Sequence, residues 1–448
     1  MSSPGTGSLG AKKQWNPPAM RTVEDTGLNM GILTDLAIKT IYFSGYLSGQ
    51  QLADRMCLPY TGVVDRIIDF MKREKWIEVR GAAGISEASY EYLISQKGSS
   101  KAQEATERNM YAGPCPVTLA QYVYAVKAQY NRPLVQREGL IKAFEDLVVG
   151  DAMLDKIGPA INSGKAIFMH GPPGNGKTTF ATRAARFVLG EDLWIPYAID
   201  VDGQVIRVYD NVNHEIVEIP EEINRTQTGV RRDPRWIKIK RPVIMVGGEL
   251  TMAGLDLVYD PINKYYEAPF QLKANCGMFF IDDFGRQQMR PQDLLNRWIV
   301  PLESRIDFLT LSTGRKIEIP FNVLIVFSTN LPPANLVDEA FLRRIPHKIE
   351  IGDPTFEQFR EIFKRMCQVK RVPYDEKALA YLIQEWYLKY NRPLRSVHPR
   401  DILDQLLDIA RYLNRPPQLT KDLIDKAADA YFVNLSGEYK PVTTGGSN

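Results

Sequence analysis

The chain has 448 residues, of which 44% are hydrophobic and 24% are charged, and its formal net charge is +3. This balance is typical of a soluble globular protein with two or three domains, and it excludes a protein that binds nucleic acid or an anionic membrane through its overall charge. The four cysteines are far apart and lack CxxC spacing, so they form neither a disulfide framework nor a zinc site. No segment has the apolar length of a signal peptide or a membrane span, and we expect a cytoplasmic protein.

The two ends of the chain have no hydrophobic periodicity, and we expect disorder over residues 1–28 and 435–448. Residues 29–105 contain three amphipathic helical segments, followed by the alternating segments WIEVRG and SYEYLIS around a Gly-containing loop. The order helix, helix, helix, strand, strand predicts a winged-helix domain. A helical linker is expected over residues 106–140.

Strands and helices then alternate over residues 141–353, which predicts an α/β domain with a parallel sheet. This region carries an insertion near residues 190–245, longer than a minimal domain of this class needs. Residues 354–434 have a purely helical pattern and are expected to form a separate C-terminal helical unit.

The strongest functional signal is the segment KAIFMHGPPGNGKTTF, an apolar strand followed by a glycine-rich loop and the start of a helix. It contains GxxxxGK[ST] in the context that a P-loop requires. Backbone N–H groups of the loop and the positive end of the helix would bind phosphates. We therefore predict an ATP site in which Lys177 reaches the β- and γ-phosphates and Thr178 binds Mg²⁺. The predicted loop residues are Gly171, Pro172, Pro173, Gly174, Asn175, Gly176, Lys177, Thr178 and Thr179.

Two further apolar strands end in polar residues. MFFIDDFGR ends in Asp282 and Asp283, and NVLIVFSTN ends in Asn330. Because the carboxyl ends of parallel strands meet at one edge of a sheet, these side chains are expected beside the P-loop. Asp282 is predicted to hold Mg²⁺ through water, Asp283 to face the water that attacks the γ-phosphate, and Asn330 to orient that water.

Arginines are expected near the γ-phosphate, because phosphoryl transfer spreads negative charge over its oxygens. Arg343 and Arg344 close a short helix, and Arg400 opens a later one, so these three are the candidates. Arg297 and Arg305 are alternatives to Arg343 and Arg344 for a role at a neighbouring subunit.

The segments GPPGNGKT, FFIDDF, STN, DEAFLRR and HPRDIL occur in the order found in AAA+ ATPases, which this chain resembles over residues 147–432. The resemblance implies an α/β P-loop core and a helical lid, here preceded by the winged helix. It implies Lys177 and Thr178 as Walker A, Asp282 and Asp283 as Walker B, Asn330 as sensor 1 and Arg400 as sensor 2.

The same resemblance implies a ring, most often a hexamer, in which Arg343 or Arg344 acts on the neighbouring subunit. It also implies that Leu147, Val148, Val149 and Gly150 pack around adenine. One position departs from the family, since the second Walker B residue is usually Glu. Asp283 is shorter by one methylene, and we expect slow but real hydrolysis.

The segment LTLSTGRKIEIPFNVLIVFSTN predicts a hairpin that turns at Thr313 and Gly314, directly before the strand of Asn330. This hairpin resembles that of the pre-sensor 1 hairpin subgroup, which includes MoxR-type chaperones. The whole arrangement looks like a group of poorly characterised bacterial winged-helix AAA+ ATPases that are sometimes associated with Flp-type pilus assembly.

Two regions were weighed as nucleic-acid contacts. Residues 231–241 (RRDPRWIKIKR) hold six Lys or Arg and one Asp around Trp236, and they could grip a phosphate backbone or simply form a solvated strand. Residues 31–97 hold eight Lys or Arg and eight Asp or Glu, which predicts weak duplex binding. We favour an ATP-driven remodeller of an unknown protein partner over a DNA-associated motor or loader, and over an ATP-dependent assembly switch with little turnover.

Overall fold

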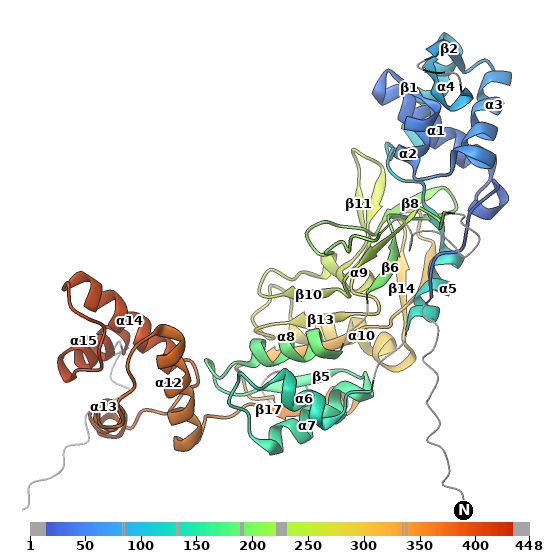
Figure 1. Cartoon of the computed structure of the whole chain (residues 1–448). Helices are drawn as coiled ribbons and strands as arrows, with labels where there is room; N and C mark the ends of the chain where they lie inside the picture. The colour runs from blue at the N-terminus through green and yellow to red at the C-terminus, as the bar shows by residue number, and fades with distance from the viewer. Residues whose placement is uncertain are drawn as a thin grey trace, which may run out of the picture.

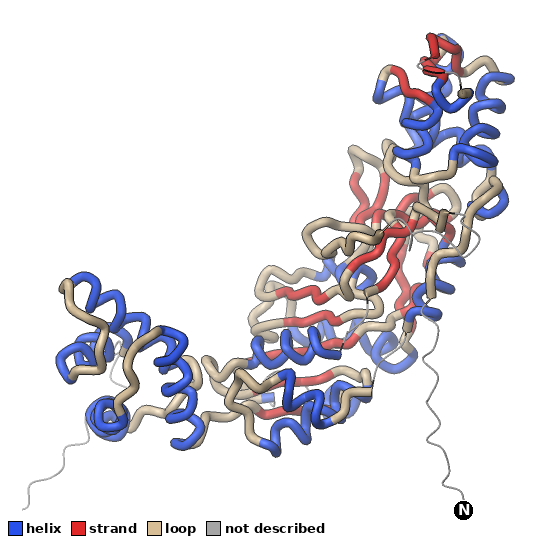
Figure 2. The backbone as a smooth tube through the Cα atoms, viewed as in Figure 1, coloured by secondary structure: helices blue, strands red, loops and turns tan. Residues whose placement is uncertain are grey.

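The computed structural model describes residues 15–82, 84, 86–130, 134–188, 192–220, 231–333, 336 and 339–432. An N-terminal helical module, a central region with two larger sheets and a C-terminal helical region follow one another along the chain (Figure 1). The two helical parts lie at opposite ends of the central region. Strands make up much of the centre, whereas helices dominate both ends (Figure 2).

The N-terminal module has the predicted helices and strands and two more elements. Its elements are α1 (Met30–Ser44), β1 (Tyr46–Ser48), α2 (Gly49–Met56), α3 (Asp65–Arg73), β2 (Ile77–Ala82), β3 (Tyr90–Ile94) and α4 (Gln96–Arg108). Asn29 caps α1 and Ser48 forms a capping box with Gln51 at α2, which explains where these helices begin. The antiparallel order β1-β3-β2 closes the module. The sequence did not predict β1 and α4, and the winged-helix assignment stays a prediction.

The central α/β core is built on a parallel sheet with helices on both faces. Its strands are β10 (Val243–Val246), β13 (Met278–Ile281), β16 (Leu324–Thr329), β5 (Ile167–His170) and β17 (His347–Glu350), in that spatial order, and every pairing is parallel. Alternate strand residues face opposite sides. Phe168, Phe279 and Phe327 pack with α10 (Pro291–Ser304), whereas Ile167, Phe280 and Val326 pack with α6 (Arg137–Ala143), α7 (Asp151–Ser163) and α8 (Lys177–Val188). The α/β fold with a parallel P-loop sheet is therefore present as predicted.

A second sheet contains strands from the predicted insertion and from other parts of the chain. It comprises β11 (Val258–Asp260), β12 (Tyr265–Glu267), β8 (Gln204–Arg207), β7 (Ala198–Val201) and β4 (Val117–Thr118), and the pair β6 (Leu193–Pro196) and β9 (Trp236–Ile239) packs beside it. Strand β10, which overlaps the end of the expected range 190–245, belongs instead to the core sheet. Strands β4, β11 and β12 join the second sheet from outside that range. The expected linker 106–140 contains β4 and α5 (Leu119–Gln129). Partners that are distant in sequence leave no local pattern from which these boundaries can be predicted.

The N-terminal segment expected to be disordered is packed from residue 15 onward. Trp15 stands edge-on to Trp236, with ring centroids 5.2 Å apart. Met20 is buried, and the carbonyl of Thr26 accepts a hydrogen bond of 2.9 Å from Arg235. Because these partners lie more than two hundred residues away in the sequence, local periodicity gave no sign of this order. Residues 1–14 and the tail 435–448 lie outside the described residues.

The predicted hairpin is present as β14 (Ile306–Thr310) and β15 (Lys316–Pro320), with Gly314 at φ +83° in its turn. The helical lid comprises α12 (Phe356–Lys370), α13 (Glu376–Leu382), α14 (His398–Tyr412) and α15 (Lys421–Tyr431) around one apolar cluster. Two short helices complete the core region, α9 (Phe270–Lys273) and α11 (Glu339–Arg344). Among the described residues, no helix combines the length and apolar character needed to cross a membrane.

Candidate nucleotide site

The P-loop links the end of β5 to the start of α8. Gly171, Gly174 and Gly176 have φ of +140°, +81° and +82°, a region that other residues rarely adopt. A Cβ at Gly171 would lie 2.2 Å from the carbonyl oxygen of Ile351, so this position also needs glycine for space. The loop backbone therefore lies at the N-terminal, positive end of α8, a position that favours the binding of an anion.

Lys177 is buried at the centre of the site. Its Nζ donates to the carbonyl oxygens of Gly171 and Pro172, both at 2.9 Å, and to Asn330 Oδ1 at 2.6 Å. Burial lowers the pKa of Lys177, while the carboxylates of Asp282 and Asp283 oppose that lowering. The Lys177 amine is thus held between the loop and Asn330 at the end of β16. From this position it could exchange its present hydrogen bonds for contacts with a phosphate.

Thr178 and Asp282 lie together as predicted for a magnesium site. The Thr178 hydroxyl donates to Asp282 Oδ2 at 2.7 Å. Hard oxygen ligands in small number suit Mg²⁺, which keeps several waters and takes further oxygens from nucleotide phosphates. Within the described parts of the chain, no group of three or more His, Cys, Asp or Glu is arranged to hold a metal on its own. The donor set therefore fits Mg²⁺ bound together with a nucleotide.

Asp283 and Asn330 extend the same network to solvent. Asn330 Nδ2 donates to Asp283 Oδ1 at 2.7 Å, and Asp283 is exposed. Its φ is +47°, a left-handed conformation that Asp adopts more readily than Glu. This backbone conformation gives a physical reason for Asp rather than Glu at this position. The turn is also held by Gln287, which the sequence analysis missed and whose Nε2 donates to the carbonyl oxygens of Asp282 and Asp283 at 2.9 and 3.2 Å.

Three of the candidate arginines are only partly exposed and contact other residues of their own chain. Arg344 Nε donates to Glu303 Oε1 at 2.6 Å. Arg297 donates to Asp307 Oδ1 at 2.6 Å, and Arg305 donates to the carbonyl oxygen of Val323 at 3.1 Å. To act at a neighbouring subunit, each of these three arginines would have to leave the contact described.

The other two candidate arginines are exposed. Arg343 lies at the end of α11. Arg400 pairs with Asp401 of its own helix, with Nε to Oδ1 at 2.9 Å. The geometry thus brings Lys177, Thr178, Asp282, Asp283 and Asn330 together, but it does not hold Arg400 against them.

The predicted adenine segment lies between the core and the lid. Leu147 and Val149 pack against the apolar cluster of α6, α7 and α8. Arg365 of α12 donates to the carbonyl oxygen of Leu147 at 3.4 Å, and a Cβ at Gly150 would lie 3.3 Å from Gln358 Nε2. Val148 is half-buried, while Pro173 and Thr179 of the P-loop are exposed. Residues 147–150 therefore lie where the core meets helix α12 of the lid, and their contact with a base stays a prediction.

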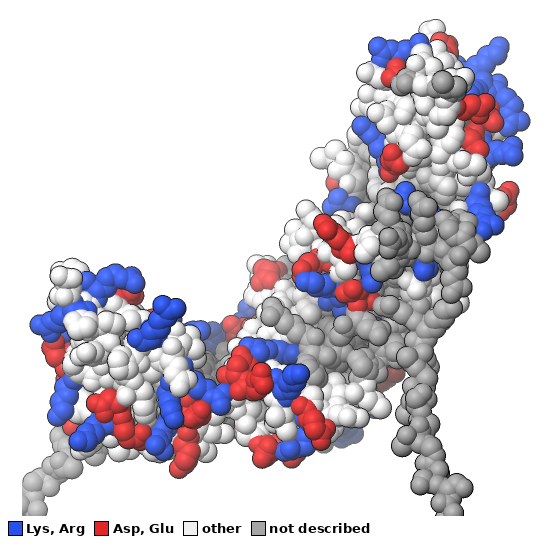
Figure 3. Space-filling model, in the orientation of Figure 1, with Lys and Arg blue, Asp and Glu red and all other residues white. Residues whose placement is uncertain are grey.

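The basic run at residues 231–241 is largely committed to the fold. Arg235 is fully buried and its Nη2 donates to Asp233 Oδ2 at 2.8 Å, while Nη1 donates to the carbonyl oxygens of Thr26 and Pro116. Trp236 is 6% exposed and packs on Trp15, so it cannot stack on a base. On the face shown in Figure 3, Lys and Arg alternate with Asp and Glu over the N-terminal module and the lid. The structural interpretation of this run is therefore favoured over nucleic-acid contact.

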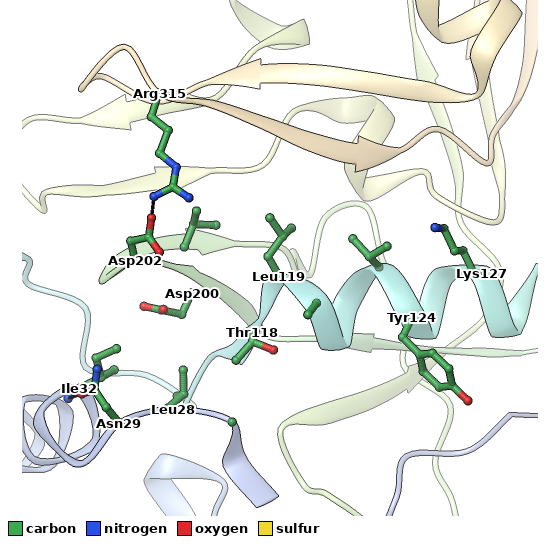
Figure 4. A pocket seen from close by; sticks show the side chains of 14 residues that line it. Leu28, Asn29, Ile32, Thr118, Leu119, Tyr124, Lys127, Asp200, Asp202 and Arg315 are labelled. Atoms are coloured by element: carbon green, nitrogen blue, oxygen red, sulfur yellow. Dashed lines mark hydrogen bonds and ion pairs between the residues drawn. The ribbon is translucent and has the colours of Figure 1, made fainter. Parts of the chain in front are cut away.

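A separate hollow of about 800 Å³ lies away from the P-loop, at the tip of the β14–β15 hairpin. Arg315 at that tip forms an ion pair with Asp202 in the β7–β8 turn, above Asp200 and the start of α5 (Figure 4). Leu28 and Ile32 of the N-terminal module complete the wall. The hollow thus lies where the hairpin, the second sheet and the N-terminal module meet.

Comparison with known proteins gives one family match and several structural likenesses. Residues 355–430 match a family described as a domain of unknown function, DUF8689, which covers the lid. A search of curated proteins found no match.

Among solved structures, the chain is similar to NtrX from Brucella abortus in complex with ADP, with 13% identity, a TM-score of 0.39, and coverage of 73% of this chain and 65% of NtrX. The NtrX complex with ATP has 12% identity and a TM-score of 0.37, and the match covers 82% of this chain and 64% of NtrX. A RuvB mutant from Thermotoga maritima has 15% identity and a TM-score of 0.35, and the match covers 67% of this chain and 73% of RuvB. The chain thus spans slightly less than two thirds of the NtrX length in these two complexes.

Proposed function

We propose that the protein is an ATP-hydrolysing enzyme of the AAA+ type that requires Mg²⁺. The observation that carries the proposal is the linked set of side chains at the carboxyl edge of the core sheet. Lys177 and Asp283 both bond to Asn330, at 2.6 and 2.7 Å, and Thr178 bonds to Asp282 at 2.7 Å. These contacts join the P-loop to the ends of two neighbouring strands, where ligands of parallel sheets bind.

Each residue of this set has a role in the proposed reaction. Lys177 and the loop N–H groups bind the phosphates, while Thr178 and Asp282 hold the metal. Asp283 accepts a proton from the attacking water, and Asn330 fixes the position of that carboxylate. Mg²⁺, when bound, would neutralise charge that develops on the phosphates. Val148, Val149 and Gly150 would contact the base.

We further propose a ring, in which Arg343 is better placed than Arg344 to act on the neighbouring subunit's nucleotide. Arg343 is exposed, whereas Arg344 is only partly exposed. A guanidinium supplied from a neighbouring subunit is worth about 10³ to 10⁵ in rate. ATP turnover per chain that rises with protein concentration as the chain assembles would support this arrangement. Turnover per chain that does not depend on protein concentration would oppose it.

The work done with ATP is proposed to be the remodelling of a protein partner through the N-terminal module. The β14–β15 hairpin directly precedes the strand of Asn330, and its tip pairs with Asp202. The second sheet then contacts the N-terminal module, since Lys264 Nζ donates to the carbonyl oxygen of Glu107 at 2.9 Å and Tyr265 packs edge-on to Tyr111. Contacts therefore run from the nucleotide site to the far end of the molecule.

The testing experiment is steady-state ATP turnover with Mg²⁺ at near-physiological salt, with Lys177→Ala as the blank. Turnover above the blank supports the ATPase, and turnover equal to the blank contradicts it. Parallel assays contain duplex or single-stranded DNA. Stimulation by DNA that falls steeply with salt would favour a DNA-associated motor instead. ATP binding and assembly without repeated turnover would favour an assembly switch.

A further inference from the structure

Three polar side chains connect the P-loop to the lid, namely those of Asn175, Asp353 and Arg395. Asn175 at the tip of the loop is only 3% exposed. Its Nδ2 donates to Asp353 Oδ1 at 2.7 Å, and its Oδ1 accepts the backbone N–H of Ser396 at 3.0 Å. Arg395 Nη1 donates to the same Asp353 oxygen at 2.9 Å. One carboxylate between core and lid therefore holds both the loop and a lid guanidinium.

Backbone contacts press this part of the lid directly onto the loop. The N–H of Val397 donates to the carbonyl oxygen of Gly174 at 2.9 Å. A Cβ on Gly174 would lie 2.7 Å from Val397 Cγ1, so glycine alone allows this approach. Residues 395–397 thus lie on the P-loop, and Arg395 sits at its rim.

The two lid arginines differ in what they contact. The Cβ of Arg395 lies 3.9 Å from the position that a Cβ on Gly174 would take, so its side chain begins beside the P-loop. Arg400, in contrast, is 59% exposed on its side chain and paired with the neighbouring Asp401. Arg395 has a side chain that is 20% exposed and faces the core through Asp353.

We propose that Arg395 is the lid arginine that contacts the phosphates of bound ATP, and that Asp353 holds it at the rim until the nucleotide competes for it. This inference rests on the proposed ATP site and deepens it. A guanidinium binds carboxylates and phosphates with the same fork of N–H donors, so exchange between them needs only a small movement. A nucleotide carries more negative charge than one carboxylate, and Asp353 is already 35% exposed to water. The exchange therefore favours the phosphate and ties lid position to nucleotide occupancy.

The test measures the dissociation constant of Mg-ATP for the full chain by fluorescence titration with a fluorescent ATP analogue. Arg395→Ala is expected to weaken binding about 10- to 100-fold, the loss typical of a charged hydrogen bond. Arg395→Lys keeps the charge without the fork and should fall in between. Asp353→Asn should tighten binding about two- to fivefold, because it removes a partly exposed competitor. The double variant should bind like Arg395→Ala alone.

Glu350→Gln is the matched control, because it removes an exposed carboxylate from the end of β17 near Asp353. If it tightens binding as much as Asp353→Asn, or if the gain from Asp353→Asn persists without Arg395, the effect is general charge and the proposal is wrong. If the parent binds ATP and Arg395→Ala binds it with the same dissociation constant, this inference alone is overturned. A parent chain that binds no ATP overturns the proposed function and this inference together.

Discussion

Replacing Asp283 by Asn tests the proposed chemistry most directly. Asn adopts left-handed backbone as readily as Asp, so the φ of +47° at this position is kept. The amide cannot accept a proton from the attacking water. A general base contributes about 10² to 10⁴ in rate. The corresponding rise in the barrier is about 3 to 5 kcal/mol.

The contacts of Lys177 and Thr178 with the loop and Asp282 do not involve the carboxylate of Asp283. ATP affinity is therefore expected to change little while kcat falls. Phosphate release at saturating Mg-ATP measures kcat, and titration with a fluorescent ATP analogue measures affinity. An Asp283→Asn chain that binds ATP and turns it over as fast as the parent would remove Asp283 from the mechanism.

Three further predictions follow from buried or crowded positions. Arg235→Met leaves its buried aspartate partner unpaired and should lower the free energy of unfolding by about 3–5 kcal/mol in urea titrations. Arg411→Met is the control, because the Arg411 side chain is 84% exposed, and it should have little effect. A loss below about 1 kcal/mol for Arg235→Met would contradict the stabilising role of the buried pair. Gly174→Ala should weaken ATP binding by displacing the lid, while Gly203→Ala, at a similar positive φ but with open space, serves as the control and should not; equal effects would point to backbone strain alone. Burial lowers the pKa of His398 to about 4, against about 6.5 in the unfolded chain. The neutral imidazole therefore contributes fully to lid stability above pH about 6.5, and this contribution is lost as the pH falls towards 4. In His398→Gln the melting midpoint should fall less between about pH 7.5 and 5, and the same pH dependence as in the parent would count against this assignment.

The grouping of the candidate site residues could be predicted because these residues follow local rules. Lys177 and Thr178 lie at a strand, loop and helix junction, and Asp282 and Asn330 end apolar strands whose ends must meet in a parallel sheet. Periodicity and spacing carry this information without any knowledge of distant contacts. The core fold and the residues at its edge therefore agree with the prediction.

Features that depend on distant partners could not be predicted in the same way. Asn175 and Arg395 meet at Asp353 across wide gaps in the sequence. Asn175 belongs to the P-loop motif, but no sequence pattern links it to the other two residues. Arg235 looked like a solvated charge because its neighbours are basic, yet its partners include Thr26 and Pro116. The second sheet likewise draws strands from several parts of the chain. Tertiary pairing decided each of these outcomes, and local sequence does not encode it.

The position of β5 between β16 and β17 in the core sheet has a consequence for how the protein is made. Its two neighbours in the sheet are residues 324–329 and 347–350, which leave the ribosome long after residues 167–170. At about 5–20 residues per second, the strand that leads into the P-loop waits roughly ten to thirty-five seconds for its full set of partners. During that time its apolar residues have no sheet to join. We expect yields of folded protein to rise when synthesis is slowed by cooling or when chaperones are supplied.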